Sequence, residues 1–292
     1  MNKLPVWNTA WGGIIFPVTH FVPLLRRLAL PVAILAGYVF LQMAVLPSML
    51  TNGTLSMEAL TVISIVMIPF AIIAYLNLFM GSLQVAIGTP EAKKVFGLGK
   101  VEALFVGYLL LIVCAYFISY IPFLLLTVAG ASVTGDTGYI VVLMILFVFV
   151  FVLFWIWALV RLLPVLGMIA DQKRLGLAQA WRMSKGNWGR IFAAGLILGL
   201  FYFLVLVPFA AMWLQNLLPQ ILEISQSTMP PGRKLLLLSG MMASSGSFGL
   251  FYSAWMAVLL IAQYGLAGFI YTALKGQADA PDPVAEAAPA AD

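Results

Sequence analysis

Charged residues are scarce in this chain. Asp, Glu, Lys and Arg make up 9% of its 292 residues, whereas apolar and aromatic residues make up 63%. A soluble globular domain has roughly 25% charged residues, so this chain has too few to cover a surface that faces water. The composition therefore argues against a soluble protein and predicts one that is surrounded by lipid.

Cysteine and histidine each occur once. Cys114 lies inside an apolar segment and has no second cysteine with which to form an intramolecular disulfide. One cysteine and one histidine cannot form a Cys/His metal cluster, so we expect no metal and no other cofactor. His20 precedes the first apolar segment, where we expect it to lie at the lipid headgroups without a catalytic role.

In place of charge the chain has long apolar segments. A helix needs about 20 apolar residues to cross the hydrocarbon of a bilayer, and six segments meet that length. The expected spans lie at about 28–50, 59–81, 103–127, 139–160, 191–215 and 247–274. The predicted fold class is thus an all-α integral membrane protein, a six-helix transmembrane bundle with interfacial amphipathic helices on the cytoplasmic side. Residues 1–276 form this membrane domain, and the acidic, proline-containing residues 277–292 are predicted to be a disordered tail.

Lys and Arg are distributed unevenly about these segments. All but two of the 15 basic residues fall on one side of the predicted membrane, and only Arg233 and Lys234 fall on the other. The side rich in Lys and Arg is cytoplasmic in multi-pass proteins. We therefore predict a multi-pass protein of the bacterial inner membrane, the cell membrane, with both termini in the cytoplasm.

The predicted spans contain few side chains that could catalyse a reaction or bind an ion. Asp, Glu, Lys, Arg and His inside a membrane mark proton relays, ion sites and substrate paths, and none of these residues lies in the six segments. Asn77 and Gln84 are two turns apart on one helix face, where they either bond between helices or line a small polar cleft. Gln263 beside Tyr264 has the same two interpretations. The sequence has no P-loop, HExxH or G-x-S-x-G motif, and we expect no enzyme activity.

Small residues recur on two of the spans. Gly195 and Gly199 form a GxxxG pattern on the fifth span, and small residues recur every four positions on the sixth. Stripes of this kind let helices approach closely. We expect them to pack within the chain, with a homodimer contact as the alternative. The residues of the sixth-span stripe are Ser245, Gly249, Ser253 and Ala257.

The connector after the fourth span, residues 161–190, mixes basic residues with two tryptophans. Residues of these types favour the headgroup layer, so we expect the connector to lie flat on the cytoplasmic leaflet. Aromatic residues between Trp7 and Phe21 indicate a second surface-lying segment. Within the connector, Gly186 is expected to take a left-handed conformation that ends the surface helix, and Asn187 to cap the next helix.

This basic surface is the predicted binding site for anionic membrane lipids or for a membrane-protein partner. Each basic residue near an anionic surface contributes about 1 kcal/mol to binding, although the general bias of Lys and Arg towards the cytoplasm accounts for the same charges. No catalytic residue, no metal ligand and no nucleic-acid partner is expected. The candidate lipid- or partner-binding residues are Arg161, Trp181, Arg182, Lys185, Asn187, Trp188 and Arg190.

The same connector resembles a pattern found in known proteins. It reads Arg161-x-x-Pro164, then a polar break at 171–174, then Ala180-Trp181-x-x-Ser184-Lys185-Gly186-Asn187 entering a span. This is similar to poorly characterised bacterial six-span proteins, the YciC-like group and the membrane domain that accompanies some glycerophosphodiester phosphodiesterases. In the latter the chemistry belongs to a separate soluble barrel domain, and this sequence contains no such domain. The resemblance implies a membrane module without enzyme activity.

Two classes of function remain open. The first is a non-enzymatic membrane protein that assists envelope or lipid organisation, or a membrane complex, through its basic cytoplasmic face. The second is an uncoupled transporter or channel-like protein for a small or lipid-like substrate. Prolines inside the spans and the Asn77/Gln84 pair favour transport, whereas the charge-free spans favour the first class. A continuous polar cavity that reaches the middle of the membrane would indicate transport.

Overall fold

Every element in the described part of the chain is a helix. The computed structural model describes residues 3–46, 49, 56–93, 99–134, 137–227, 229–230 and 246–278. Nearly all of the predicted acidic tail, from residue 279 on, lies outside them. The elements are α1 (Val6–Thr19), α2 (Phe21–Phe40), the π-helical turn η1 (Leu41–Val45), α4 (Met57–Ile87), the 3-10 turn η2 (Pro90–Lys93), α5 (Lys100–Thr134), α6 (Thr137–Leu162), α7 (Pro164–Gln172), α8 (Leu177–Met183), α9 (Trp188–Gln226) and α11 (Gly246–Ala278).

Six segments are long and apolar enough to cross a membrane. They are Phe21–Phe40, Thr61–Ile87, Lys100–Pro122, Met144–Gln172, Trp188–Gln215 and Ala254–Gln277. Large apolar side chains lie exposed along these helices, among them Ile145 and Phe149 of α6. A protein in water does not expose apolar surface on this scale. The chain is therefore a multi-pass membrane protein, and the predicted all-α membrane bundle is confirmed.

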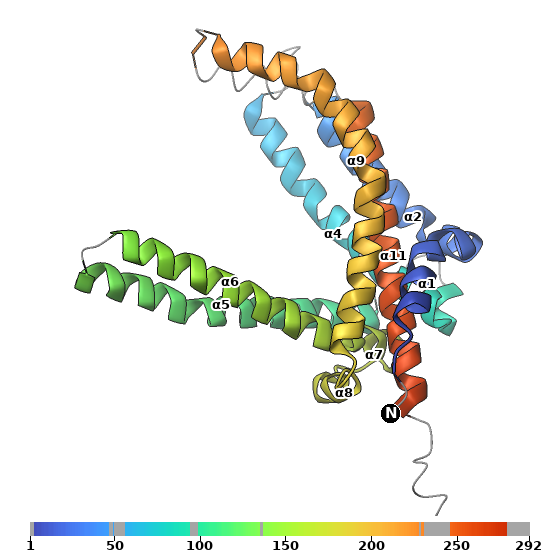
Figure 1. The fold of residues 1–292 in the computed structure, drawn as a ribbon. Helices are drawn as coiled ribbons and strands as arrows, with labels where there is room; N and C mark the ends of the chain where they lie inside the picture. Colours follow the sequence, from blue (N-terminus) through green and yellow to red (C-terminus); the bar gives the residue numbers. More distant parts are fainter. Residues whose placement is uncertain are drawn as a thin grey trace, which may run out of the picture.

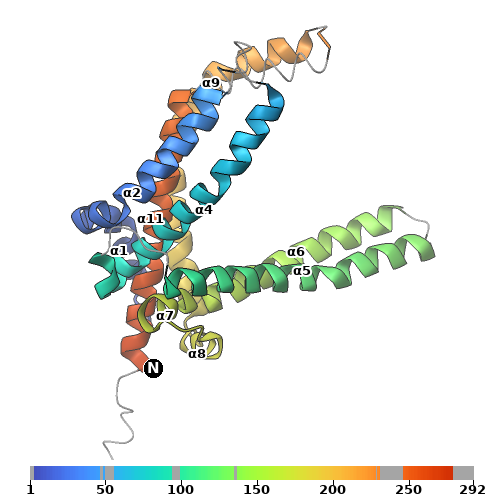
Figure 2. The same cartoon turned by 180° about the vertical axis from the view of Figure 1, so that it is seen from behind.

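The long helices form two groups that meet at one end. Helices α2, α4, α9 and α11 run together, whereas α5 and α6 form a hairpin that projects to the side of them (Figure 1). The view from behind shows the same arrangement (Figure 2). Helices α7 and α8 lie where the two groups meet, and we call this end of the molecule the base.

One face of helix α1 packs into the bundle, whereas Trp7 and Trp11 on its outer face are 65% and 47% exposed, so the surface-lying segment stays a prediction. The backbone N–H of Leu4 meets the side chain of Asn187 at the start of α9, and Tyr202 farther along α9 donates to the carbonyl of Ile14. Helix α1 therefore runs parallel to α9. Gly13 faces Leu198 and Leu266 so closely that a Cβ atom at this glycine would lie 2.9 Å from either side chain. Of the apolar side chains of α1, Ala10, Ile14 and Phe16 are buried between helices.

Helix α7 is also buried, although the connector was predicted to lie flat on the membrane. Residues 164–170 are all buried, and the helix packs against α4, α5 and α11. A Cβ atom at Gly167 would overlap the ring of Tyr271, so glycine permits the contact between α7 and α11. Since residues 164–170 contain no polar side chain, this helix has no face suited to the headgroup layer.

Close helix contacts occur at other glycines than those predicted. A Cβ atom at Gly195 or Gly199 would meet nothing within 4 Å, so the GxxxG pattern does not pack against the described part of the chain. In α11 the close contacts are made by Gly265 with Phe16 of α1 and by Gly268 with Ala86 of α4. In the predicted stripe on the sixth span, Ser245 and the side-chain surroundings of Gly249 and Ser253 lie outside the described residues.

Candidate functional site

The basic connector folds into a corner between α8 and α9. Helix α8 ends at Met183, and Gly186 takes the predicted left-handed conformation with φ of 77°. Asn187 precedes the first residue of α9, but its side chain makes no capping hydrogen bond to that helix. The predicted turn is confirmed, whereas the predicted cap is wrong because the side chain of Asn187 has another partner.

That partner is the N-terminal segment. The Oδ1 atom of Asn187 accepts a hydrogen bond of 3.1 Å from the backbone N–H of Leu4, and Nη1 of Arg190 donates one of 3.0 Å to the carbonyl of Leu4. Leu4 and Asn187 are both buried. A buried backbone group without a partner is costly, so Asn187 and Arg190 hold the start of the chain against α9.

Arg161 joins α6 to α8. Its guanidinium lies 4.3 Å from the centre of the Trp181 ring, within the range of a cation–π contact. It also donates from Nη2 to the Trp181 carbonyl at 3.1 Å and from Nε to Ser184 Oγ at 3.4 Å. Trp157 of α6 meets Trp181 edge to face, with ring centres 5.0 Å apart. Arg161 and Trp181 are therefore part of the framework of the corner.

The remaining three candidate residues are exposed. Arg182, Lys185 and Trp188 lie on the outside of the corner, and Trp188 is 45% exposed. Within the described part of the chain their side chains form no hydrogen bond or ion pair. The structure thus divides the seven predicted residues into four that fix the corner and three that remain available to something outside the chain.

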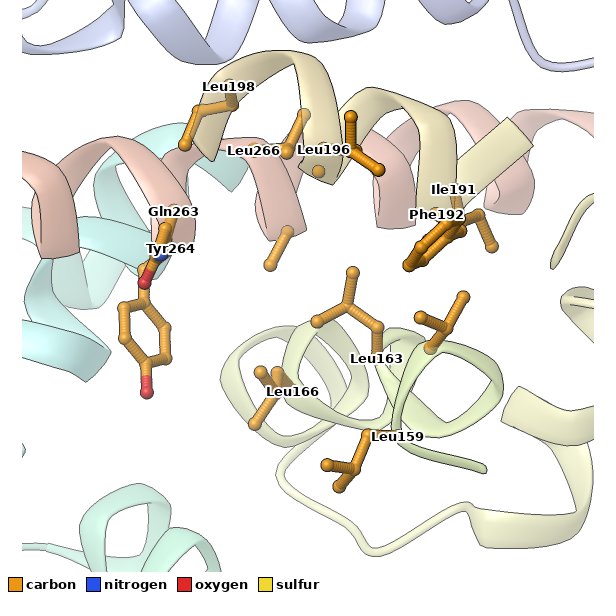
Figure 3. A pocket seen from close by; sticks show the side chains of 13 residues that line it. Leu159, Leu163, Leu166, Ile191, Phe192, Leu196, Leu198, Gln263, Tyr264 and Leu266 are labelled. Carbon is orange, nitrogen blue, oxygen red and sulfur yellow. The ribbon is translucent and has the colours of Figure 1, made fainter. Parts of the chain in front are cut away.

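An apolar groove opens beside the corner. It has a volume of about 470 Å³ and lies between α6, α7, α9 and α11 (Figure 3). Sites for small ligands have volumes of about 300–1,000 Å³. The lining residues of the groove are Leu159, Val160, Leu163, Leu166, Ile191, Phe192, Gly195, Leu196, Leu198, Gln263, Tyr264, Leu266 and Ala267.

Gln263 and Tyr264 are the two polar residues in the wall of the groove. The side chain of Gln263 is exposed and forms no hydrogen bond with any described residue, so the predicted bond between helices is not seen there. The ring of Tyr264 stacks on Phe79 of α4 with centres 4.5 Å apart. The groove is thus an apolar site with a single exposed amide.

A buried ionic cluster was not predicted from the sequence. Arg27 donates from Nη2 to Gln84 Oε1 at 3.2 Å and lies 3.7 Å from the carboxylate of Glu102. Gln84 therefore bonds between helices, as one of its two interpretations predicted, whereas Asn77 donates within its own helix to the Ile73 carbonyl. Arg27 and Glu102 each border a predicted span, at the end that the Lys and Arg distribution predicts to be cytoplasmic, and that shared position was the signal for their pairing.

A second polar cluster closes the base between α7 and α11. The carboxylate of Asp171 accepts from the Tyr271 hydroxyl at 2.7 Å and from Lys275 Nζ at 2.8 Å. The Gln172 amide donates to the same hydroxyl at 3.1 Å. Among the described residues no three His, Cys, Asp or Glu side chains lie together as metal ligands would.

Comparisons with known protein families, with curated proteins and with solved structures give no match for this chain. The resemblance to the YciC-like group stays a prediction, and the function has to be inferred from the geometry of the corner and the groove.

Proposed function

We propose that this chain is a non-enzymatic protein of the bacterial inner membrane, with its base and both termini in the cytoplasm, that assists lipid organisation by binding anionic headgroups at the corner between α8 and α9. The observation that carries the proposal is the exposure of Arg182, Lys185 and Trp188 on a corner that other residues hold in place.

Two positive charges beside an indole suit the surface of an anionic leaflet. Each base near such a surface contributes about 1 kcal/mol to binding, and tryptophan favours the level of the headgroups. Arg161 and Asn187 fix the two sides of the corner. A binding group on a rigid support is positioned without a further loss of conformational freedom.

Transport of a small polar substrate is the less supported alternative. Three cavities among the described residues have volumes of about 310, 470 and 590 Å³, and almost all of their lining residues are apolar. The path of a polar substrate needs polar groups along its length. The walls of these cavities suit hydrocarbon, which favours a role with lipids.

The proposal is tested by lipid binding of the purified protein in detergent. Native mass spectrometry compares retained phosphatidylglycerol with retained phosphatidylcholine of the same acyl chains. We expect wild type to prefer the anionic lipid, and Arg182→Glu/Lys185→Glu to lose that preference.

The matched control is Arg26→Glu/Lys100→Glu, which changes the net charge equally at two exposed residues outside the corner. We expect the control to keep most of the preference for the anionic lipid. An equal loss in both double variants would mean that total charge, rather than the corner, determines lipid binding.

A further inference from the structure

We infer that the groove between α6, α7, α9 and α11 holds one acyl chain of the anionic phospholipid whose headgroup lies at the corner. This inference rests on the proposed function and adds to it a site inside the membrane. It gives a role to Gly195 and to the Gln263 amide, neither of which makes a close contact or a hydrogen bond within the described part of the chain.

The groove continues directly from the corner. Trp188, Phe192 and Gly195 are spaced by four and three residues, which places them on one face of α9. Trp188 belongs to the corner, and both Phe192 and Gly195 line the groove. A lipid whose headgroup meets Lys185 and Trp188 therefore has an apolar path for one of its chains within the next turns of α9.

Gly195 keeps this path open. Space remains where a Cβ atom would stand on this residue, since no heavy atom other than those of the adjoining α9 backbone and the two neighbouring residues lies within 4 Å of that position. GxxxG patterns let a second apolar chain approach the helix backbone closely. Because no described helix occupies that position, an acyl chain can lie along the glycine face.

Gln263 indicates an occupant that carries a hydrogen-bond acceptor. Its exposed amide lies in an apolar wall within a span. A polar group in hydrocarbon is costly unless it is hydrogen-bonded. The ester carbonyl of a phospholipid can accept from the amide, whereas a purely hydrocarbon neighbour cannot.

The test fills the groove without disturbing the protein. Gly195→Leu adds a side chain where the structure has open space, and Gly37→Leu is the matched control because it is exposed in α2 with equally free surroundings. A leucine displaces at least two methylene groups of a bound chain, so we expect Gly195→Leu to weaken phosphatidylglycerol retention roughly tenfold. Gly37→Leu should retain the lipid as wild type does.

Gln263→Met tests the amide with a side chain of similar length. We expect it to retain less phosphatidylglycerol at an unchanged unfolding midpoint. Wild-type retention by Gly195→Leu or by Gln263→Met overturns the groove site. If Arg182→Glu/Lys185→Glu still loses lipid in that case, headgroup binding at the corner stands without the groove.

The same spectra report the number of protein chains in each complex. If wild type is a dimer and Gly195→Leu is a monomer, the glycine face binds a second copy of this chain rather than an acyl chain, and the inference is overturned.

Discussion

The guanidinium of Arg27 in α2 lies 3.7 Å from the carboxylate of Glu102 at the start of α5, and the two side chains are only 2% and 8% exposed. This ion pair links the projecting α5–α6 hairpin to the group of helices that contains α2 and α4. Gly81 of α4 makes room for it, because a Cβ atom there would lie 3.1 Å from Arg27 Cγ and 2.6 Å from Leu28 Cδ2.

Removing one charge of this pair should destabilise the protein strongly. In Glu102→Gln the buried guanidinium keeps its hydrogen bond to Gln84 but loses its counter-charge. Removing one partner of a buried ion pair lowers the free energy of unfolding by about 3–5 kcal/mol. Thermal unfolding in detergent measures the effect. Arg27→Met/Glu102→Gln leaves no buried charge and should recover most of the loss. A double variant as unstable as the sum of both single variants would show that the two side chains do not depend on each other.

Contact between α7 and α11 gives a second prediction. Gly167→Ala places a methyl group against the ring of Tyr271, and both helices are surrounded by other buried residues. We expect a loss of about 1–3 kcal/mol in unfolding free energy, as for other overpacked cores. Gly195→Ala is the control, because its new methyl group meets open space. Equal unfolding midpoints for the two variants would contradict the packing of α7.

The sequence predicted the class of fold because hydrophobic length depends on composition alone. Six apolar segments of sufficient length require six helices whatever their neighbours are. The burial of α7 was harder to foresee, because the bases and tryptophans in the same connector also suit a membrane surface. A helix without a polar face, such as residues 164–170, is the feature that indicates burial.

The sequence grouped the seven candidate residues in one connector but did not separate those that hold the corner from those that are exposed. Arg161, Asn187 and Lys185 stand together in the connector, and nothing in their spacing distinguishes a framework residue from an exposed one. Asn187 is committed to Leu4, which is 183 residues away. Hydrogen-bond partners so far apart in the sequence are brought together by the packing of the helices. The spacing of residues in a single sequence does not show which helices pack together.

Arg161 should tolerate even a conservative change poorly. Arg161→Lys keeps the charge but loses the planar guanidinium that lies over Trp181 while it donates to the carbonyl of the same residue. We expect the backbone amides of α8 to exchange with deuterium several times faster, because the lost cation–π contact stabilises the helix by about 1 kcal/mol. Arg182→Lys, on the exposed side, should leave these rates unchanged. Similar rates in all three proteins would mean that α8 is held without Arg161.

Orientation in the membrane is the last prediction. All but two of the 15 Lys and Arg residues fall on one side of the predicted membrane. The base belongs to that side, because Lys275 near the end of α11 forms an ion pair with Asp171 there. Lys and Arg set topology while Asp and Glu contribute little, so the acidic residues after Lys275 should not reverse it. A cytoplasm-only reporter fused after Lys275 should be active, and a periplasm-only reporter at the same position should be silent. The reverse result would place the corner between α8 and α9 on the outer surface, away from the leaflet that attracts its charges.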